Sequence, residues 1–283
     1  MARVPRGKAR NSGRISVMSI RSLSLFLAAT LPFAMVAAQE APVPADEHEF
    51  EELGVNRYTA PSIARIFKQL DELKPLPFEQ LKRDLPQLVP GDREQKGLLF
   101  GGLIADGFLL VEAERKNLIE KFGRVLLQQA RGLSVADRVT RHSASLTELG
   151  RRGDWPRMRA ELIQTQTDVE QAMVELRDEK MAHLISLGGW LRGLEICASA
   201  IASDFSPERA KVLAQPDLAD YFTTELNTLP PEVAHRALFE KVRAGMKVLQ
   251  PLLSKPPQAL SAADARLIEA HARELNSAIR QNE

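Results

Sequence analysis

Residues 184–201 read LISLGGWLRGLEICASAI, and this stretch indicates how the whole chain folds. Apolar and small residues cover nearly every side of it, and its only charged members are Arg192 and Glu195. A helix that is apolar nearly all round belongs in the interior of a protein. We therefore expect a core helix here, with the remaining helices packed around it.

The segment before this core helix has the most regular apolar spacing in the chain. Its apolar positions repeat at intervals of three and four residues, which is typical of a helix-bundle or coiled-coil seam. These positions are Trp155, Met158, Leu162, Thr165, Val169, Ala172 and Leu176. We expect Asp154 to cap the helix and the opposite face to be a solvated surface, formed by Arg157, Glu161, Glu170 and Arg177.

The rest of the folded part also predicts helices, because alternating Val, Ile and Thr runs bounded by turn residues are absent. We expect a long apolar helix from about Arg93 to Ala130, bent or broken near its glycines, and a helix capped by Ser134. We expect later helices to begin at Pro207, Pro216 and Pro231, and a last one, capped by Ser261 and Asp264, to turn Leu267, Ala270, Leu275 and Ile279 inward. The expected fold class is all-α, an irregular multi-helix bundle of about seven to nine helices with a long central helix.

Two predicted helices carry stripes of small residues at a spacing of four. One stripe is Gly97, Gly101 and Ala105, and the other is Gly189, Gly193 and Cys197. Each glycine inside a helix costs about 1 kcal/mol relative to Ala, so something must offset the loss. We expect the stripes to meet and let two helix backbones approach closely. The alternative is a groove between these helices that holds a flat or chain-like ligand.

Cys197 is the only cysteine, so the chain contains no internal disulfide. Its neighbours are apolar, and we expect a buried, inert thiol. We expect no membrane span in the mature protein, because Asp106 interrupts one apolar helix and Arg192 the other.

The N-terminus predicts export. Residues 1–38 contain six basic and no acidic side chains, an apolar block at Leu23 to Val36, and small residues at the end, as a cleavable signal peptide does. The true start lies either at Met1 or at Met18. We expect residues 39–57 to be a flexible acidic linker and residues 58–283 to be a single helical domain.

Removal of the signal changes the charge balance. Residues 1–38 hold six of the 38 basic residues and none of the 37 acidic ones, which leaves 32 against 37 and a net charge of −5. A mildly acidic protein has no electrostatic reason to bind nucleic acid or anionic lipid.

No catalytic, metal or cofactor motif is present, so we predict no catalytic residues, no metal site and no cofactor. Glu232 and His235 form a single Glu-x-x-His, whereas a di-metal site in a helix bundle needs two such motifs and further carboxylates. We expect Glu179 and His183 to be a surface pair. The predicted function is that of an exported, periplasmic or secreted, non-catalytic interaction or structural protein of the bacterial envelope, with a protein or another envelope component as its partner. The alternatives are a carrier of a hydrophobic small molecule between the glycine-bearing helices, and an enzyme with a cryptic site.

Overall fold

The computed structural model of the chain describes residues 64–86 and 92–281. These residues form helices and no strand, so the predicted all-α class is confirmed for the described part of the chain. The predicted signal peptide, the acidic linker and the start of the folded domain near Tyr58 lie outside the described residues.

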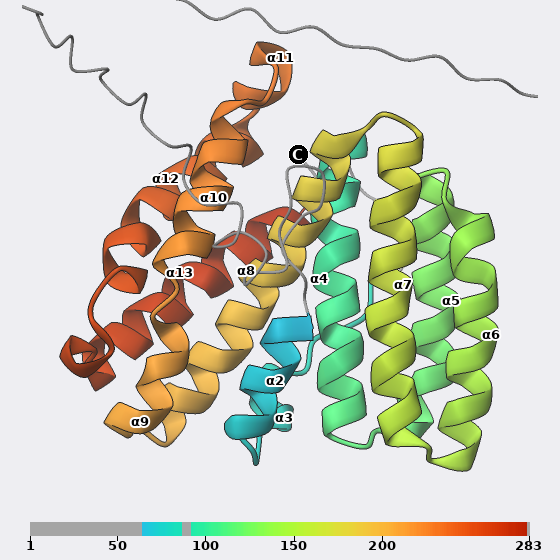
Figure 1. The fold of residues 1–283 in the computed structure, drawn as a ribbon, viewed down its shortest axis with the longest axis horizontal. Coiled ribbons are helices and arrows are strands. Elements are labelled where there is room, and N and C mark those ends of the chain that lie inside the picture. Colours follow the sequence, from blue (N-terminus) through green and yellow to red (C-terminus); the bar gives the residue numbers. More distant parts are fainter. Residues whose placement is uncertain (1–63, 87–91, 282–283) are drawn as a thin grey trace, which may run out of the picture. The chain divides into compact units, whose positions relative to one another are not determined.

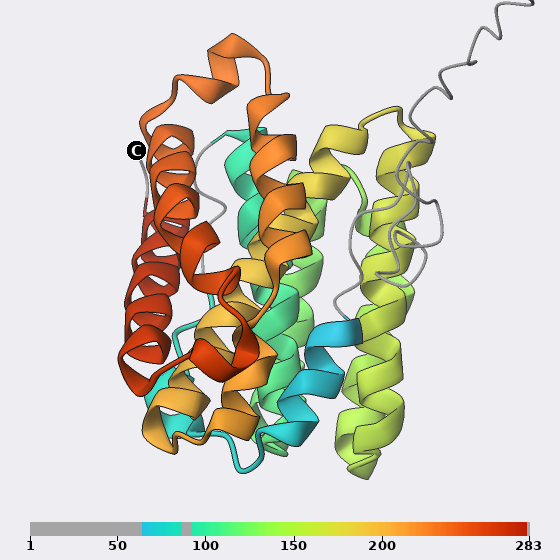
Figure 2. The same cartoon turned by 60° about the vertical axis from the view of Figure 1, so that its left-hand side comes forward.

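The helix α8 (Glu179–Ser203) is the core of the bundle, as predicted. It packs against α4 (Arg93–Glu112), α7 (Trp155–Glu175) and α13 (Ala262–Arg280). Figures 1 and 2 both show α8 passing between α4 on one side and the C-terminal helices on the other. By length and composition α8 could cross a membrane, but 100% of its most apolar window is buried inside the protein, as expected for a core helix.

The helices α4 to α7 lie side by side in Figure 1, with α5 at Lys116–Gly132 and α6 at Ala136–Arg152. On the other side of α8 lie α10 (Pro216–Asn227), α12 (Ala237–Leu253) and α13, which pack on one another. The helix α2 (Ala64–Glu72) also contacts α8. Three helices have only four residues each: α3 (Phe78–Leu81), α9 (Pro207–Ala210) and α11 (Pro231–Ala234). The number of helices in the described part is therefore slightly higher than the seven to nine predicted.

The predicted helix from Arg93 to Ala130 is wrong in one respect, because two helices occupy this range. The chain turns at Glu114, whose φ is 53°, and α5 then packs back against α4. The glycines do not break the helix, since Gly97, Gly101, Gly102 and Gly107 all lie inside α4. In the same way, His235 ends α11 before α12 begins, so one predicted helix is two.

The predicted caps are right at two positions and wrong at one. Asp154 accepts a hydrogen bond from the backbone nitrogen of Arg157, and Ser261 and Asp264 form a complete capping box. Ser134 is not a cap, because it takes a φ of 63° in the turn and α6 begins two residues later without a side-chain cap.

In two helices, residues that were predicted to face the core are exposed in the structure. Leu176 and Leu267 are 57% and 49% exposed, because Leu176 follows the last turn of α7 and α13 is rotated relative to the prediction. The face of α13 that is buried carries Ile268, Ala272, Leu275, Asn276 and Ile279, and Ala270 is exposed.

Candidate functional site

A buried ion pair connects the two central helices. Arg192 of α8 donates from Nε to Oδ1 of Asp106 of α4 at 2.7 Å. The side chain of Arg192 is 1% exposed and that of Asp106 is 10% exposed. A buried charge is tolerated only when it is paired and hydrogen-bonded, so each helix accommodates its charge through the other.

Two further charged side chains extend this pair. Arg83, in the segment after α3, donates from Nε to Oδ2 of Asp106 at 2.7 Å. Glu195 of α8 lies 2.8 Å from Nη1 of Arg192, and Nη2 of Arg192 donates to the carbonyl oxygen of Leu81. We call Arg83, Asp106, Arg192 and Glu195 the buried charge network. It fixes the segment after α3 against α4 and α8.

The charges in this network control each other's ionisation. Burial opposes the charged form of Asp106, but Arg83 and Arg192 outweigh it and hold the pKa of the carboxyl below its usual value. Burial lowers the pKa of Arg83 to about 10, and the positive charges of Arg192 and Arg280 lower it further while Asp106 opposes them. Arg83 is therefore the member whose positive charge is least well compensated.

A cavity of about 590 Å³ lies beside the network, and Arg83 and Asp106 form part of its wall. Its walls come from α3 and the segment after it, from α4, from α5 and from the last turn of α13. The apolar lining consists of Phe78, Leu85, Leu109, Leu110 and Leu118. The charged lining consists of Lys82, Arg83, Lys121 and Arg280 with Asp84 and Asp106. This size is ordinary for a small-molecule site, and so is a mainly apolar wall with a few charged groups.

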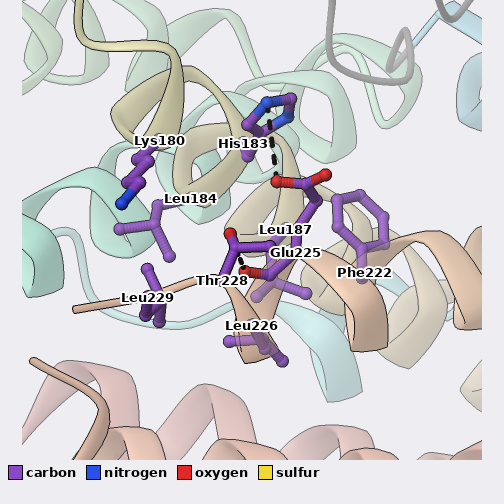
Figure 3. A pocket seen from close by; sticks show the side chains of 9 residues that line it. All are labelled: Lys180, His183, Leu184, Leu187, Phe222, Glu225, Leu226, Thr228 and Leu229. Carbon is purple, nitrogen blue, oxygen red and sulfur yellow. Dashed lines mark hydrogen bonds and ion pairs between the residues drawn. The ribbon is translucent and has the colours of Figure 1, made fainter. Parts of the chain in front are cut away.

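A second group of polar side chains lies between α8 and α10 (Figure 3). His183 contacts the hydroxyl of Tyr221 through Nδ1, and its Nε2 is 3.7 Å from Glu225. The His183 side chain is 14% exposed, so the predicted surface pair of Glu179 and His183 is wrong. Burial lowers the pKa of His183, although Glu225 and Glu179 oppose this. The adjacent cavity of about 10 Å³ offers no more space than a single water needs, so these residues hold helices together.

The predicted solvated face of α7 is also partly wrong. Glu161 contacts Nδ1 of the buried His142 at 2.6 Å, and Asp168 contacts its Nε2 at 2.9 Å, which ties α7 to α6. Glu170 accepts a hydrogen bond from Ser186 of α8 at 2.7 Å, and burial raises the pKa of its carboxyl to about 8. These carboxylates contribute to helix packing.

Of the stripe residues predicted from the sequence, Gly97 and Gly101 lie in the contact between α4 and α8. A Cβ atom at Gly101 would overlap the carbonyl oxygen of Ile185 and lie 2.7 Å from the backbone nitrogen of Gly189. At Gly97 it would overlap the sulfur of Met181. A Cβ atom at Gly188 of α8 would in turn overlap the carbonyl oxygen of Leu98 in α4.

The other stripe residues are buried, and no stripe residue lines either cavity. Ala105 and Cys197 are 2% and 1% exposed, and Gly189 and Gly193 are also buried. Burial raises the pKa of the Cys197 thiol to about 12, which keeps it protonated. The lining of both cavities consists of residues other than these six.

No protein-family model, curated protein or solved structure matches this chain. The site is therefore interpreted from its own residues. Within the described ranges, no group of three or more His, Cys, Asp or Glu side chains is arranged to hold a metal ion.

The cavity was not predicted from the sequence, although the sequence contains one signal of it. Asp106 and Arg192 are charged residues in apolar helices, and such residues need a buried partner. From the sequence, these two charges were interpreted only as evidence that the apolar helices do not span a membrane. Arg83, Lys121 and Arg280 carry no sequence signal that distinguishes them from other surface cations.

Proposed function

We propose that this chain is an exported, non-catalytic binding protein of the bacterial envelope that holds a small molecule with an apolar part in the 590 Å³ cavity. The observation that carries the proposal is the cavity itself, with five apolar side chains facing one space. A carrier of a hydrophobic small molecule was one of the alternatives that the sequence left open. Here the proposed binding site lies between α3, α4, α5 and α13, and not between the glycine-bearing helices.

The surrounding structure supports a preformed site. Leu109 and Leu110 belong to α4, which packs on the core helix, and Leu109 is only 2% exposed. The buried charge network fixes the segment that forms the opposite wall. A cavity with rigid walls binds a ligand with little loss of conformational entropy, so affinity does not have to offset ordering of the protein.

Export is supported by the N-terminal sequence. A basic start, an apolar block and small residues before Gln39 match the pattern that signal peptidase cleaves. N-terminal sequencing of protein from the native envelope fraction is expected to begin at Gln39. Recovery of intact residues 19–38 in the membrane fraction would mean that the segment is an anchor.

The binding proposal is tested with a neutral apolar fluorescent probe, N-phenyl-naphthylamine, on the mature chain. We expect saturable binding that Leu118→Trp weakens by about tenfold, because the larger ring fills cavity volume. Leu127→Trp is the matched control, since Leu127 is also partly buried on α5 but lines neither cavity. Equal binding by both variants, or no saturable binding by the parent, would contradict the proposal. Native mass spectrometry of the purified protein is an independent test, and we expect it to detect a bound small molecule.

A further inference from the structure

We infer that the ligand of this cavity is an amphipathic anion, with one negatively charged group near Arg83 and Arg280 and an apolar chain along Leu109, Leu110 and Leu118. This inference rests on the proposed function, because it names the class of molecule that the same cavity holds. Four cationic and two anionic side chains line the cavity, so its charged side has a positive excess.

Of the two carboxylates in the wall, Asp106 is already paired, whereas Asp84 is exposed. Asp106 accepts from Arg192 on Oδ1 and from Arg83 on Oδ2, so two guanidinium groups share its one negative charge. Glu195, the other acid of the buried charge network, pairs with Arg192 and Arg273. The network therefore neutralises its own members, and the charges that stay unpaired in the described part of the wall are those of Lys121, Arg280 and Asp84, two positive and one negative.

Arg280 is held at the cavity by the backbone. Its Nη2 donates to the carbonyl oxygen of Asp84, which brings the last turn of α13 to the segment after α3. Within residues 64–86 and 92–281, neither Arg280 nor Lys121 forms an ion pair, whereas Lys82 pairs with Glu79. Arg280 also lies close enough to Arg83 to lower the pKa of that guanidinium. An anion between them would compensate this repulsion through charge-assisted hydrogen bonds.

The apolar wall determines the rest of the ligand. Leu109 and Leu110 are consecutive on α4, Leu118 is on α5, and Phe78 closes the side formed by α3. These side chains offer no hydrogen bonds, so they favour a hydrocarbon chain over a polar body. A medium-chain carboxylate has both features, and decanoate is the probe used below.

Isothermal titration calorimetry on the full mature chain compares three probes. Decanoate carries the chain and the negative charge, decyltrimethylammonium carries the same chain with the opposite charge, and acetate carries the charge without the chain. We expect decanoate to bind at least about tenfold more tightly than either of the others, because decyltrimethylammonium lacks the charge-assisted contact and acetate lacks the buried chain. Decanoate affinity is also expected to fall as salt concentration rises.

Matched variants locate the charge. Arg280→Gln and Lys121→Gln are expected to weaken decanoate binding, Arg280→Gln by about tenfold, and to leave the neutral naphthylamine probe unaffected. Arg266→Gln on α13 and Lys116→Gln on α5 are the controls, because both residues are exposed and neither lines the cavity. Equal affinity for decanoate and decyltrimethylammonium, or equal effects of Arg280→Gln and Arg266→Gln, would overturn the inference.

The two proposals fail in different ways. If the naphthylamine probe binds and responds to Leu118→Trp while decanoate shows no preference, the cavity is a binding site for another class of ligand and only the inference is wrong. If neither probe binds, both proposals are wrong.

Discussion

At the scale of single residues, the structure depends most on one shared carboxylate. Asp106 is the acceptor for two guanidinium groups that lie on different elements. Replacement by Asn keeps the shape but leaves Arg83 without a counter-charge and Arg192 with Glu195 alone. We expect Asp106→Asn to destabilise the protein by about 3–5 kcal/mol, the usual loss on breaking a buried pair.

Urea denaturation measures this loss, and Asp84→Asn is the control. Asp84 is exposed, lines the same cavity and forms no ion pair within the described ranges. Its replacement is expected to change stability by less than about 0.5 kcal/mol. Similar stabilities of the two variants would show that the buried charge network does not hold α4 and α8 together.

Glu170 makes stability depend on pH in the opposite way from most carboxyls. Burial raises its folded-state pKa from 4.5 to about 8, so between these values the folded protein keeps a proton that the unfolded chain releases. Stability should therefore fall as pH rises through this window, and Glu170→Gln should remove about 1 kcal/mol or more of that fall. Chemical denaturation of both proteins at about pH 5 and about pH 8 measures it. An identical fall in parent and variant would contradict the assignment to Glu170.

At the scale of elements, the sequence predicted the helices better than their ends. The apolar composition of residues 184–201 was enough to place α8 in the centre. The turns at Glu114 and Arg177, with φ of 53° and 57°, were not predictable, because glycine is the residue that usually takes such a conformation. Tertiary packing decides these turns, since α5 returns along α4 and α8 along α7. The glycines of α4 permit close packing and do not break the helix.

Gly101 gives the sharpest test of that packing. A methyl group there would collide with backbone atoms of Ile185 and Gly189, which cannot move aside as a side chain can. We expect Gly101→Ala to destabilise by about 1–3 kcal/mol or more, as overpacking does. Gly102→Ala, one residue further on, is the control, because the atom closest to its added methyl group is Nη2 of the Arg83 side chain at 3.2 Å and no backbone atom is closer than 3.6 Å. Thermal melts compare the variants, and a Gly101→Ala protein as stable as the Gly102→Ala protein would exclude close contact between α4 and α8.

At the scale of the whole molecule, the candidate site was hidden from the sequence for a simple reason. Its walls come from residues 78–85, 106–110 and 118–121 and from Arg280, which are separated by up to about two hundred positions. No spacing rule connects segments so far apart, and the cations among them resemble any surface cation. The sequence does allow one prediction about Asp106 and Arg192, the charged residues of the apolar helices: each needs a partner, because a buried charge requires one. The identity of that partner came only from the packing.

The position of α8 predicts how the described part unfolds. It packs on α4 and α7 on one side and on α10 and α13 on the other, so both groups of helices bury apolar surface against it. We therefore expect one cooperative transition. The two tryptophans report from different sides, because Trp155 starts α7 whereas Trp190 stacks on Phe222 of α10 at 5.1 Å.

Trp155→Phe and Trp190→Phe each leave a single fluorescent reporter, and a two-state protein gives coincident transitions by different probes. Each variant is therefore unfolded in urea and followed by its own fluorescence and by far-ultraviolet circular dichroism. We expect the fluorescence and dichroism midpoints to agree within each variant, even if one substitution lowers stability by about 1–2 kcal/mol relative to the other. A fluorescence transition that precedes the dichroism transition in one variant and follows it in the other would show that the helices on the two sides of α8 unfold as separate units.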